Sequence, residues 1–137
     1  MPRRSIATGI LLLLCVGLAG CGRSGDQAQA TEVTERFFAA VGSGDDATAC
    51  AQLSTDTRKA LEDDERKPCR EAIGGLRIDP GSPTKVALYL TNAKADLDNG
   101  ESAFLSQTAE GWRLSAVGCK PGDGPPTDAP MDCELEA

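Results

Sequence analysis

Cysteine is the residue type in this sequence of 137 residues that is best suited to chemistry. Four of the six cysteines lie beyond residue 40, at Cys50, Cys69, Cys119 and Cys133. Four thiolates could hold a zinc ion, but such sites usually contain close pairs of the form C-x-x-C, which are absent here. Two disulfides are therefore favoured, with three possible pairings. Proximity in the sequence favours Cys50 with Cys69 and Cys119 with Cys133.

The other side chains offer little support for acid–base, metal or phosphate chemistry. Histidine is absent, so the usual general base at neutral pH and the commonest zinc ligand are missing. The glycines over 42–44 are not followed by the lysine of a phosphate-binding loop. The carboxylates over 45–46 and 63–65 lack the alternating spacing of a calcium loop. We therefore expect no metal ion and no cofactor, and we interpret these charge runs as solvated surface.

The N-terminal segment carries a further kind of cysteine chemistry. A short basic region precedes an aliphatic run over 10–16, and Leu-Ala-Gly-Cys follows at 18–21. The run is too short to cross a bilayer and is typical of a secretory signal. The last four residues resemble the bacterial lipobox, which implies cleavage before Cys21 and attachment of acyl chains to Cys21. The alternative is an ordinary signal peptide with an incidental cysteine.

These features predict a protein held by its lipid anchor on the extracytoplasmic face of the cell membrane. Residues 1–20 would be the signal peptide, 21–30 the lipidated cysteine and a flexible tether, and 31–137 one small folded domain. Removal of the signal takes away two arginines and no acid, so the net charge changes from −7 to −9. Such an acidic domain should repel nucleic acid and anionic lipid. Disulfides persist in this oxidising location.

The first part of the folded domain has the pattern of helices. Apolar residues that recur every four positions predict a helix over 31–41. Capping residues predict a short second helix after 45–46 and a third after Ser54. A helical turn over 69–73 should follow Pro68, which suits the first turn of a helix.

The second part of the domain has the alternating pattern of β-strands. The strands are expected over 84–90, 93–97, 102–108 and 112–119. The side chains expected to point inward are Val86, Leu88, Leu90, Phe104, Trp112, Leu114 and Ala116. The tail over 120–130 should be irregular, with Cys133 pinning it to the last strand. Helices followed by an antiparallel meander define the α+β class.

Several segments together resemble the small actinobacterial lipoproteins with an NTF2-like domain. The segments are FFAAVGSGD, ATACAQLS, GWRLSAVGCKP and DCELE, and the resemblance covers residues 31–137. It implies that the N-terminal helices pack on an antiparallel meander sheet curled into a cone, with disulfides and often an apolar pocket inside. Most members of that group lack an assigned activity, so the resemblance implies no reaction.

Our leading functional hypothesis is a non-enzymatic module whose cone binds a small apolar ligand or an envelope protein. The predicted pocket residues are Phe37, Val41, Leu88, Phe104 and Trp112, and plain core packing is the competing interpretation of each. An empty apolar cavity would favour a ligand, and a filled interior would favour docking.

Two alternative hypotheses belong to other classes. The first is an accessory subunit of a membrane complex that docks through the outer face of the sheet. The second is an enzyme similar to the NTF2-like isomerases, which use a buried aspartate base with tyrosine and protonated aspartate as hydrogen-bond donors. That enzyme would require Tyr89 to converge with Asp79 or Asp96.

Overall fold

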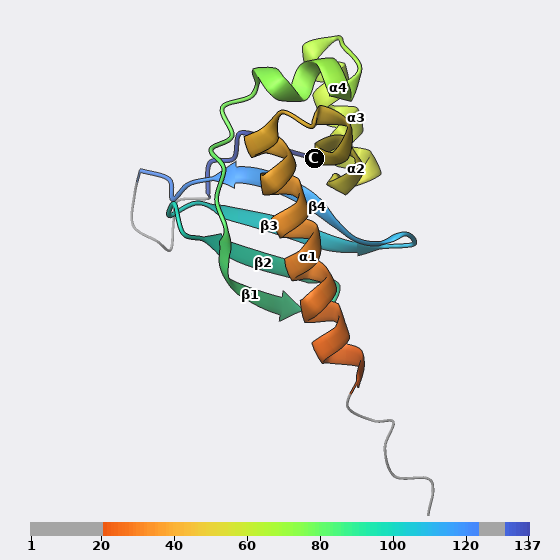
Figure 1. Ribbon diagram of the computed structural model, residues 1–137, viewed down its shortest axis with the longest axis vertical. Coiled ribbons are helices and arrows are strands. Elements are labelled where there is room, and N and C mark those ends of the chain that lie inside the picture. Colours follow the sequence, from red (N-terminus) through yellow and green to blue (C-terminus); the bar gives the residue numbers. More distant parts are fainter. Residues whose placement is uncertain (1–20, 124–130) are drawn as a thin grey trace, which may run out of the picture.

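The computed structural model describes residues 21–123 and 131–137. The predicted signal peptide over 1–20 and residues 124–130 of the predicted tail lie outside these ranges. The helices come first along the chain (Figure 1): α1 (Cys21–Ser43), α2 (Asp46–Gln52), α3 (Thr55–Glu65), α4 (Cys69–Ala72) and the 3₁₀ turn η1 (Ile73–Gly75). The strands follow: β1 (Pro83–Tyr89), β2 (Asn92–Leu97), β3 (Ser102–Thr108), β4 (Gly111–Cys119) and β5 (Leu135–Glu136).

The strands form one antiparallel sheet in the order β1-β2-β3-β4-β5, so the predicted meander and the α+β class are confirmed. Helix α1 lies across one face of the sheet, and α2, α3 and α4 gather beside β4 (Figure 1). The junction between α2 and α3 is held at that edge, because the Ser54 amide donates to the Leu114 carbonyl at 2.8 Å.

The sheet is not strongly curled, so the structure does not form the cone that the resemblance implied (Figure 1). The residues of the sheet that face α1 include Ala93, Ala95 and Ala103, and each is at most 1% exposed. Methyl side chains let the helix approach the sheet closely, and a wide cone interior has no room to form between them.

Helix α1 begins at Cys21, ten residues before the predicted start. Residues 22–30 are small or polar, and for that reason the sequence predicts a flexible tether there. In the structure these residues are helical, so the expectation of a flexible segment is wrong for them.

Tertiary contacts explain the extended start of α1. The Trp112 indole donates to Asp26 Oδ1 at 3.2 Å, and the Gln27 amide donates to the Val86 carbonyl at 3.0 Å. Ala30 is completely buried. Packing of this kind contributes most of the stability of a protein helix and overrides weak local preference. Such partners are far away in the sequence, and composition does not reveal them.

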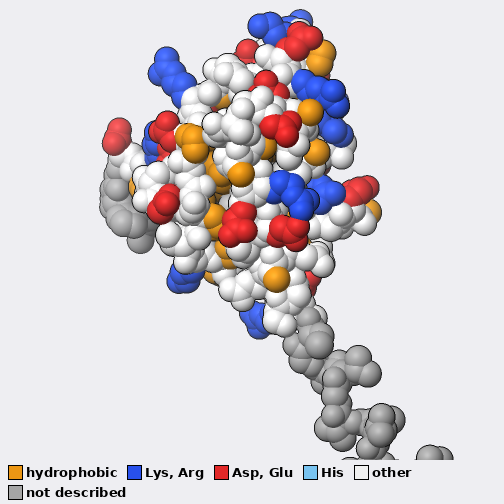
Figure 2. Space-filling view, viewed as in Figure 1, with side chains coloured by type: hydrophobic (Ala, Val, Ile, Leu, Met, Phe, Trp, Pro, Cys, Tyr) orange, Lys and Arg blue, Asp and Glu red, His pale blue; other side chains and the backbone are white. Residues whose placement is uncertain are grey.

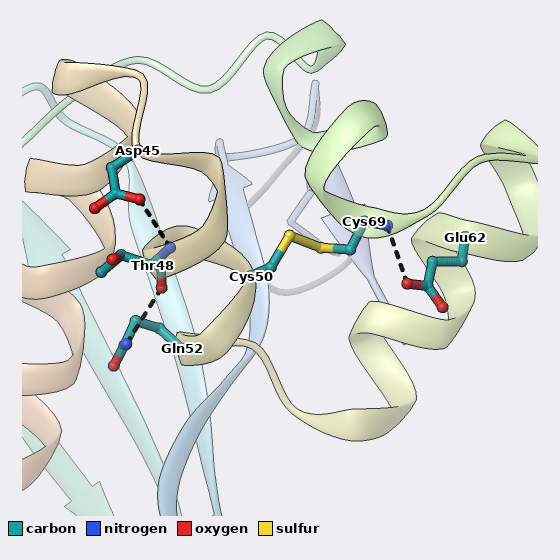
Figure 3. Close-up of a disulfide and its surroundings, with 6 residues drawn as sticks. All are labelled: Asp45, Thr48, Cys50, Gln52, Glu62 and Cys69. Carbon is teal, nitrogen blue, oxygen red and sulfur yellow. Dashed lines mark hydrogen bonds between the residues drawn. A yellow bond between two sulfur atoms is a disulfide. The ribbon is translucent and has the colours of Figure 1, made fainter.

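Side-chain caps begin α2 and α3 where the sequence predicts them. Asp45 Oδ1 accepts from the Thr48 amide at 3.1 Å (Figure 3), and Ser54 Oγ accepts from the Thr57 amide at 3.1 Å. Side-chain and backbone hydrogen bonds from Thr48 lower the pKa of Asp45. The predicted capping positions are therefore confirmed.

Both disulfides favoured by proximity are present. Cys50–Cys69 joins α2 to α4, and the Cys69 amide donates to Glu62 Oε1 at 2.9 Å (Figure 3). Cys119–Cys133 joins the end of β4 to the segment before β5. The two bonds tie the short helices together and fix the C-terminal residues to the sheet.

Candidate functional site

The five predicted pocket residues do not surround a common cavity. Phe37 and Trp112 are buried in the core, at 0% and 1% exposure, and Val41 and Leu88 pack against the core from its margin. Phe104 is half-buried and lies on the other face of the sheet, where it pairs with Lys94. The structure therefore brings four of these residues to one side of the sheet as packing groups and leaves Phe104 apart.

The prediction that Phe104 points inward is wrong. Its neighbours Ala103 and Leu105 are both completely buried, so these two residues of β3 face the core. The pairing of β3 with β4 is irregular on either side of Phe104. A shift of one residue exchanges the two faces of a strand. The large apolar side chain of Phe104 suggested that it points inward, and this assigned the residues of β3 to the wrong faces.

The space between α1 and the sheet is filled by large side chains. The rings of Phe37 and Phe38 meet edge to face with centroids 5.1 Å apart. Leu105 and Leu114 are completely buried beside Trp112 in the same core cluster. The inward direction predicted for Trp112 and Leu114 is confirmed. A filled interior is the result that favours docking over binding of an internal ligand.

A hollow of about 490 Å³ lies at the surface between α1 and the segment that leads into β1. It is open to solvent, and Glu35, Phe38, Pro80 and Asp98 are among its lining residues. None of the five predicted pocket residues lines it. Among the residues that the structure describes, no three metal-ligating side chains gather into a cluster.

The residues of the isomerase hypothesis do not converge. Asp79 precedes β1 and Tyr89 ends it, so about 20 Å of extended strand separates the two ends. Tyr89 is 60% exposed and does not face the interior. Asp96 accepts from Ser102 Oγ at 3.0 Å, and a hydrogen bond from Lys94 lowers the pKa of Asp96. A protonated, buried aspartate beside a tyrosine is not assembled here.

The face of the sheet opposite α1 carries every charged residue of β1, β2, β3 and β4. Residues paired across antiparallel strands share a face, and the register places Lys85 opposite Asp96, Lys94 opposite Phe104, and Ser106 opposite Arg113. We call this surface the outer face. It consists of Lys85, Ala87, Tyr89, Asn92, Lys94, Asp96, Phe104, Ser106 and Arg113.

The outer face is basic although the protein is acidic. It holds three cationic side chains and one anionic side chain, whereas the whole chain has a net charge of −7. Lys94 Nζ lies 2.8 Å from Asp96 Oδ1, which leaves Lys85 and Arg113 to dominate the local potential. Figure 2 shows the side of the molecule with α1, where acidic and basic side chains are intermixed.

No helix covers the outer face within residues 21–123 and 131–137. Helix α1 lies on the opposite face, and the smaller helices lie beside β4 (Figure 1). Phe104 therefore keeps part of its ring in solvent at the centre of this face. The sequence pattern predicts an inward Phe104, whereas Ala103 and Leu105 on either side of it occupy the buried positions.

A second exposed apolar feature is the turn between β1 and β2. Leu90 is 97% exposed and follows Tyr89, which is 60% exposed. The prediction that Leu90 points inward with Val86 and Leu88 is wrong, because β1 ends at Tyr89 and Leu90 occupies the turn. Thr91 and Asn92 are polar, and they were the sequence signal for that turn.

An ion pair between an exposed lysine and a buried glutamate lies at the start of the C-terminal segment. Glu101 is 4% exposed, and Lys120 Nζ lies 3.1 Å from Glu101 Oε1. The Glu101 carboxylate raises the pKa of Lys120. The backbones of Lys120 and Asp132 exchange hydrogen bonds of 2.7 and 2.9 Å at the same place. Nothing in the sequence pattern pointed to Glu101 as the partner.

Comparisons with protein-family models, curated proteins and solved structures find no significant match. The resemblance to NTF2-like lipoproteins therefore stays a prediction, and the α+β class and the disulfides stand on the structure. The two disulfides are consistent with an extracytoplasmic location. Among the helices of the described residues, none is long and apolar enough to span a membrane.

Proposed function

We propose that the protein is a lipid-anchored module on the extracytoplasmic face of the membrane that docks an envelope protein through the outer face of its sheet. The observation that carries the proposal is the outer face, on which no helix packs, with Phe104 at its centre and an excess of basic side chains around it. The lipid anchor rests on the lipobox at residues 18–21 and on the two disulfides, which suit an exported protein.

Docking is favoured over the binding of a small ligand because the core leaves no internal pocket at the predicted residues. The side chains that would have lined a cone, Phe37 and Trp112, are buried as packing groups. The proposal assigns no reaction to the protein, since Asp79 precedes the start of β1 and Tyr89 ends the strand.

The partner should present an acidic surface around an apolar contact. Aromatic side chains and arginine are enriched at protein interfaces, and Phe104 and Arg113 belong to these types. Charge complementarity mainly raises the association rate and orients the partner. The acidic remainder of the module would repel the same partner, so binding is directed to the outer face.

Photo-crosslinking in native membranes tests the docking surface. A photoreactive amino acid at Phe104 should give a discrete adduct with one envelope protein, and Arg113→Glu should lower its yield about tenfold, the effect of about 1.4 kcal/mol in affinity. The matched control is the same amino acid at Ala47, which is exposed on α2 and should give no such adduct. Equal adducts at the two positions, or no effect of Arg113→Glu, would contradict the proposal.

A separate prediction tests the anchor. Cys21→Ala should leave an uncleaved precursor or release the protein from the membrane, because each buried CH₂ of an acyl chain contributes about 0.8 kcal/mol to binding. Detergent-phase partitioning and the mass of the mature chain measure the result. Cys15→Ala, which changes the other cysteine of the N-terminal segment, should have no effect. Normal processing and partitioning of Cys21→Ala would refute the lipid anchor.

A further inference from the structure

We infer that the turn formed by Tyr89 and Leu90 rests on the lipid bilayer that holds the protein. The inference deepens the proposed function and rests on its lipid anchor at Cys21. It assigns a role to the two large apolar residues that are exposed in the described part of the chain.

Leu90 is placed where an ordinary packing role cannot explain it. Its side chain is 97% exposed, and its φ angle of +56° lies in the left-handed region that glycine favours. A leucine in this position has backbone strain and no contact to offset that strain. The two-residue turn between Tyr89 and Asn92 imposes this positive φ, which glycine would adopt without strain. Strained backbone positions of this kind cluster at functional sites.

The turn lies at the end of the molecule from which the anchor extends. The hydrogen bond from Gln27 to Val86 places the first part of α1 beside β1. Cys21 lies about 9 Å from Gln27 along the helix, and Leu90 lies about 13 Å beyond Val86 along the strand. Strand β1 is the edge of the sheet nearest the start of α1 (Figure 1).

The continuous helix makes this placement relevant to the membrane. Because α1 runs without interruption from Cys21 to Ser43, a bilayer at Cys21 lies directly against the folded domain and not at the end of a tether. Residues on the same end of the domain are then within reach of the headgroups.

The chemistry of the turn suits the boundary between headgroups and acyl chains. Tyrosine is enriched at that boundary because its ring is apolar and its hydroxyl is polar, and leucine adds apolar area. Tyr89 shares a row across the sheet with Arg113, through Asn92 and Ser106. Arg113 lies on β4, three strands from Tyr89, and adds a basic side chain at the same end of the sheet, which favours anionic headgroups.

A dye at position 90 of the lipidated chain tests the contact. In Leu90→Cys the new thiol is the only free one, since Cys21 is acylated and the other cysteines form disulfides. With the protein in vesicles of phosphatidylethanolamine and phosphatidylglycerol, an environment-sensitive dye should brighten about threefold as it leaves water. Quenchers on the acyl chains should then quench it. The same dye on Ala47→Cys, an exposed position of α2 beyond the far end of α1, should stay unchanged.

A second variant separates the leucine from the affinity of the dye itself. The dye is moved to Thr91→Cys, which is exposed in the same turn, and is compared with and without Leu90→Gly. Glycine accepts the positive φ, so the variant should fold as well as the parent. Loss of the brightening with Leu90→Gly supports the contact, and unchanged brightening overturns it.

The remaining outcomes distinguish the inference from the proposed function. If the protein floats with the vesicles but the dye at position 90 behaves like the dye at position 47, the inference is overturned and the anchor stands. If the protein does not float, the anchor is refuted and the inference falls with it. Brightening in native membranes but not in pure lipid overturns the inference in favour of a protein contact at the turn.

Discussion

Replacing Trp112 with alanine should lower the free energy of unfolding by about 3–5 kcal/mol, a large part of the stability of a small domain. The indole is 1% exposed, so its removal leaves a cavity in the core between the sheet and α1. It also removes the donor to Asp26 Oδ1 at 3.2 Å. Urea denaturation followed by circular dichroism measures the change, since the variant lacks the only tryptophan.

Trp112→Phe is the matched control for this prediction. A phenyl ring keeps most of the buried area but lacks the indole N–H, so the expected loss is about 1–2 kcal/mol. The prediction fails if Trp112→Ala unfolds at the urea concentration of the parent. Native fluorescence that is red-shifted and quenched by iodide would agree with such a failure, because it would mean an exposed indole.

The position of Trp112 along α1 was harder to predict than its burial. Alternation in the last strand correctly predicts that the indole points inward, and Trp112 is predicted to line the same pocket as Phe37. In the structure its hydrogen-bond partner is Asp26, which lies about 16 Å from Phe37 along the helix. The reason is the early start of α1, which the composition of residues 22–30 concealed.

Features with local causes could be predicted from the sequence. The Asp45 and Ser54 caps depend on hydrogen bonds to an amide three residues later. The order of strands follows from short turns, because adjacent strands joined by tight turns pair antiparallel. Both disulfides join cysteines that are near in sequence, separated by 19 and 14 residues.

Features that depend on contacts between residues far apart in the sequence could not be predicted from it. The predicted cone depended on how far the sheet curls, and this depends on side-chain volumes that meet only in the folded core. The buried side chains of Ala93, Ala95 and Ala103 provide a packing surface for α1. An alternating strand pattern does not distinguish an alanine that packs against a helix from one that lines a pocket. The candidate docking face followed only from the corrected alternation around Phe104.

Removing the disulfide between α2 and α4 is the second change with a large expected effect. Cys50→Ala together with Cys69→Ala should lower the free energy of unfolding by about 3 kcal/mol, because the bond restricts a loop of this length in the unfolded chain. The bond closes a sequence separation of 19 residues. Urea denaturation of the variant and parent under non-reducing conditions measures the difference.

Removing the disulfide should also destabilise α4 locally within the native state. Helix α4 has only four residues, too few to be stable alone. Without the disulfide, the hydrogen bond from the Cys69 amide to Glu62 still joins α4 to α3. The amide hydrogens of α4 should therefore exchange faster in the variant, while those of β3 and β4 follow global unfolding.

A matched change on α2 separates the covalent bond from simple perturbation of the helix. Ala51 is exposed beside Cys50, so Ala51→Ser should alter the stability by no more than about 0.5 kcal/mol. Reducing the parent protein should reproduce the loss seen in the double variant and add the loss from Cys119–Cys133. If the double variant is as stable as the parent, the Cys50–Cys69 disulfide does not stabilise this fold.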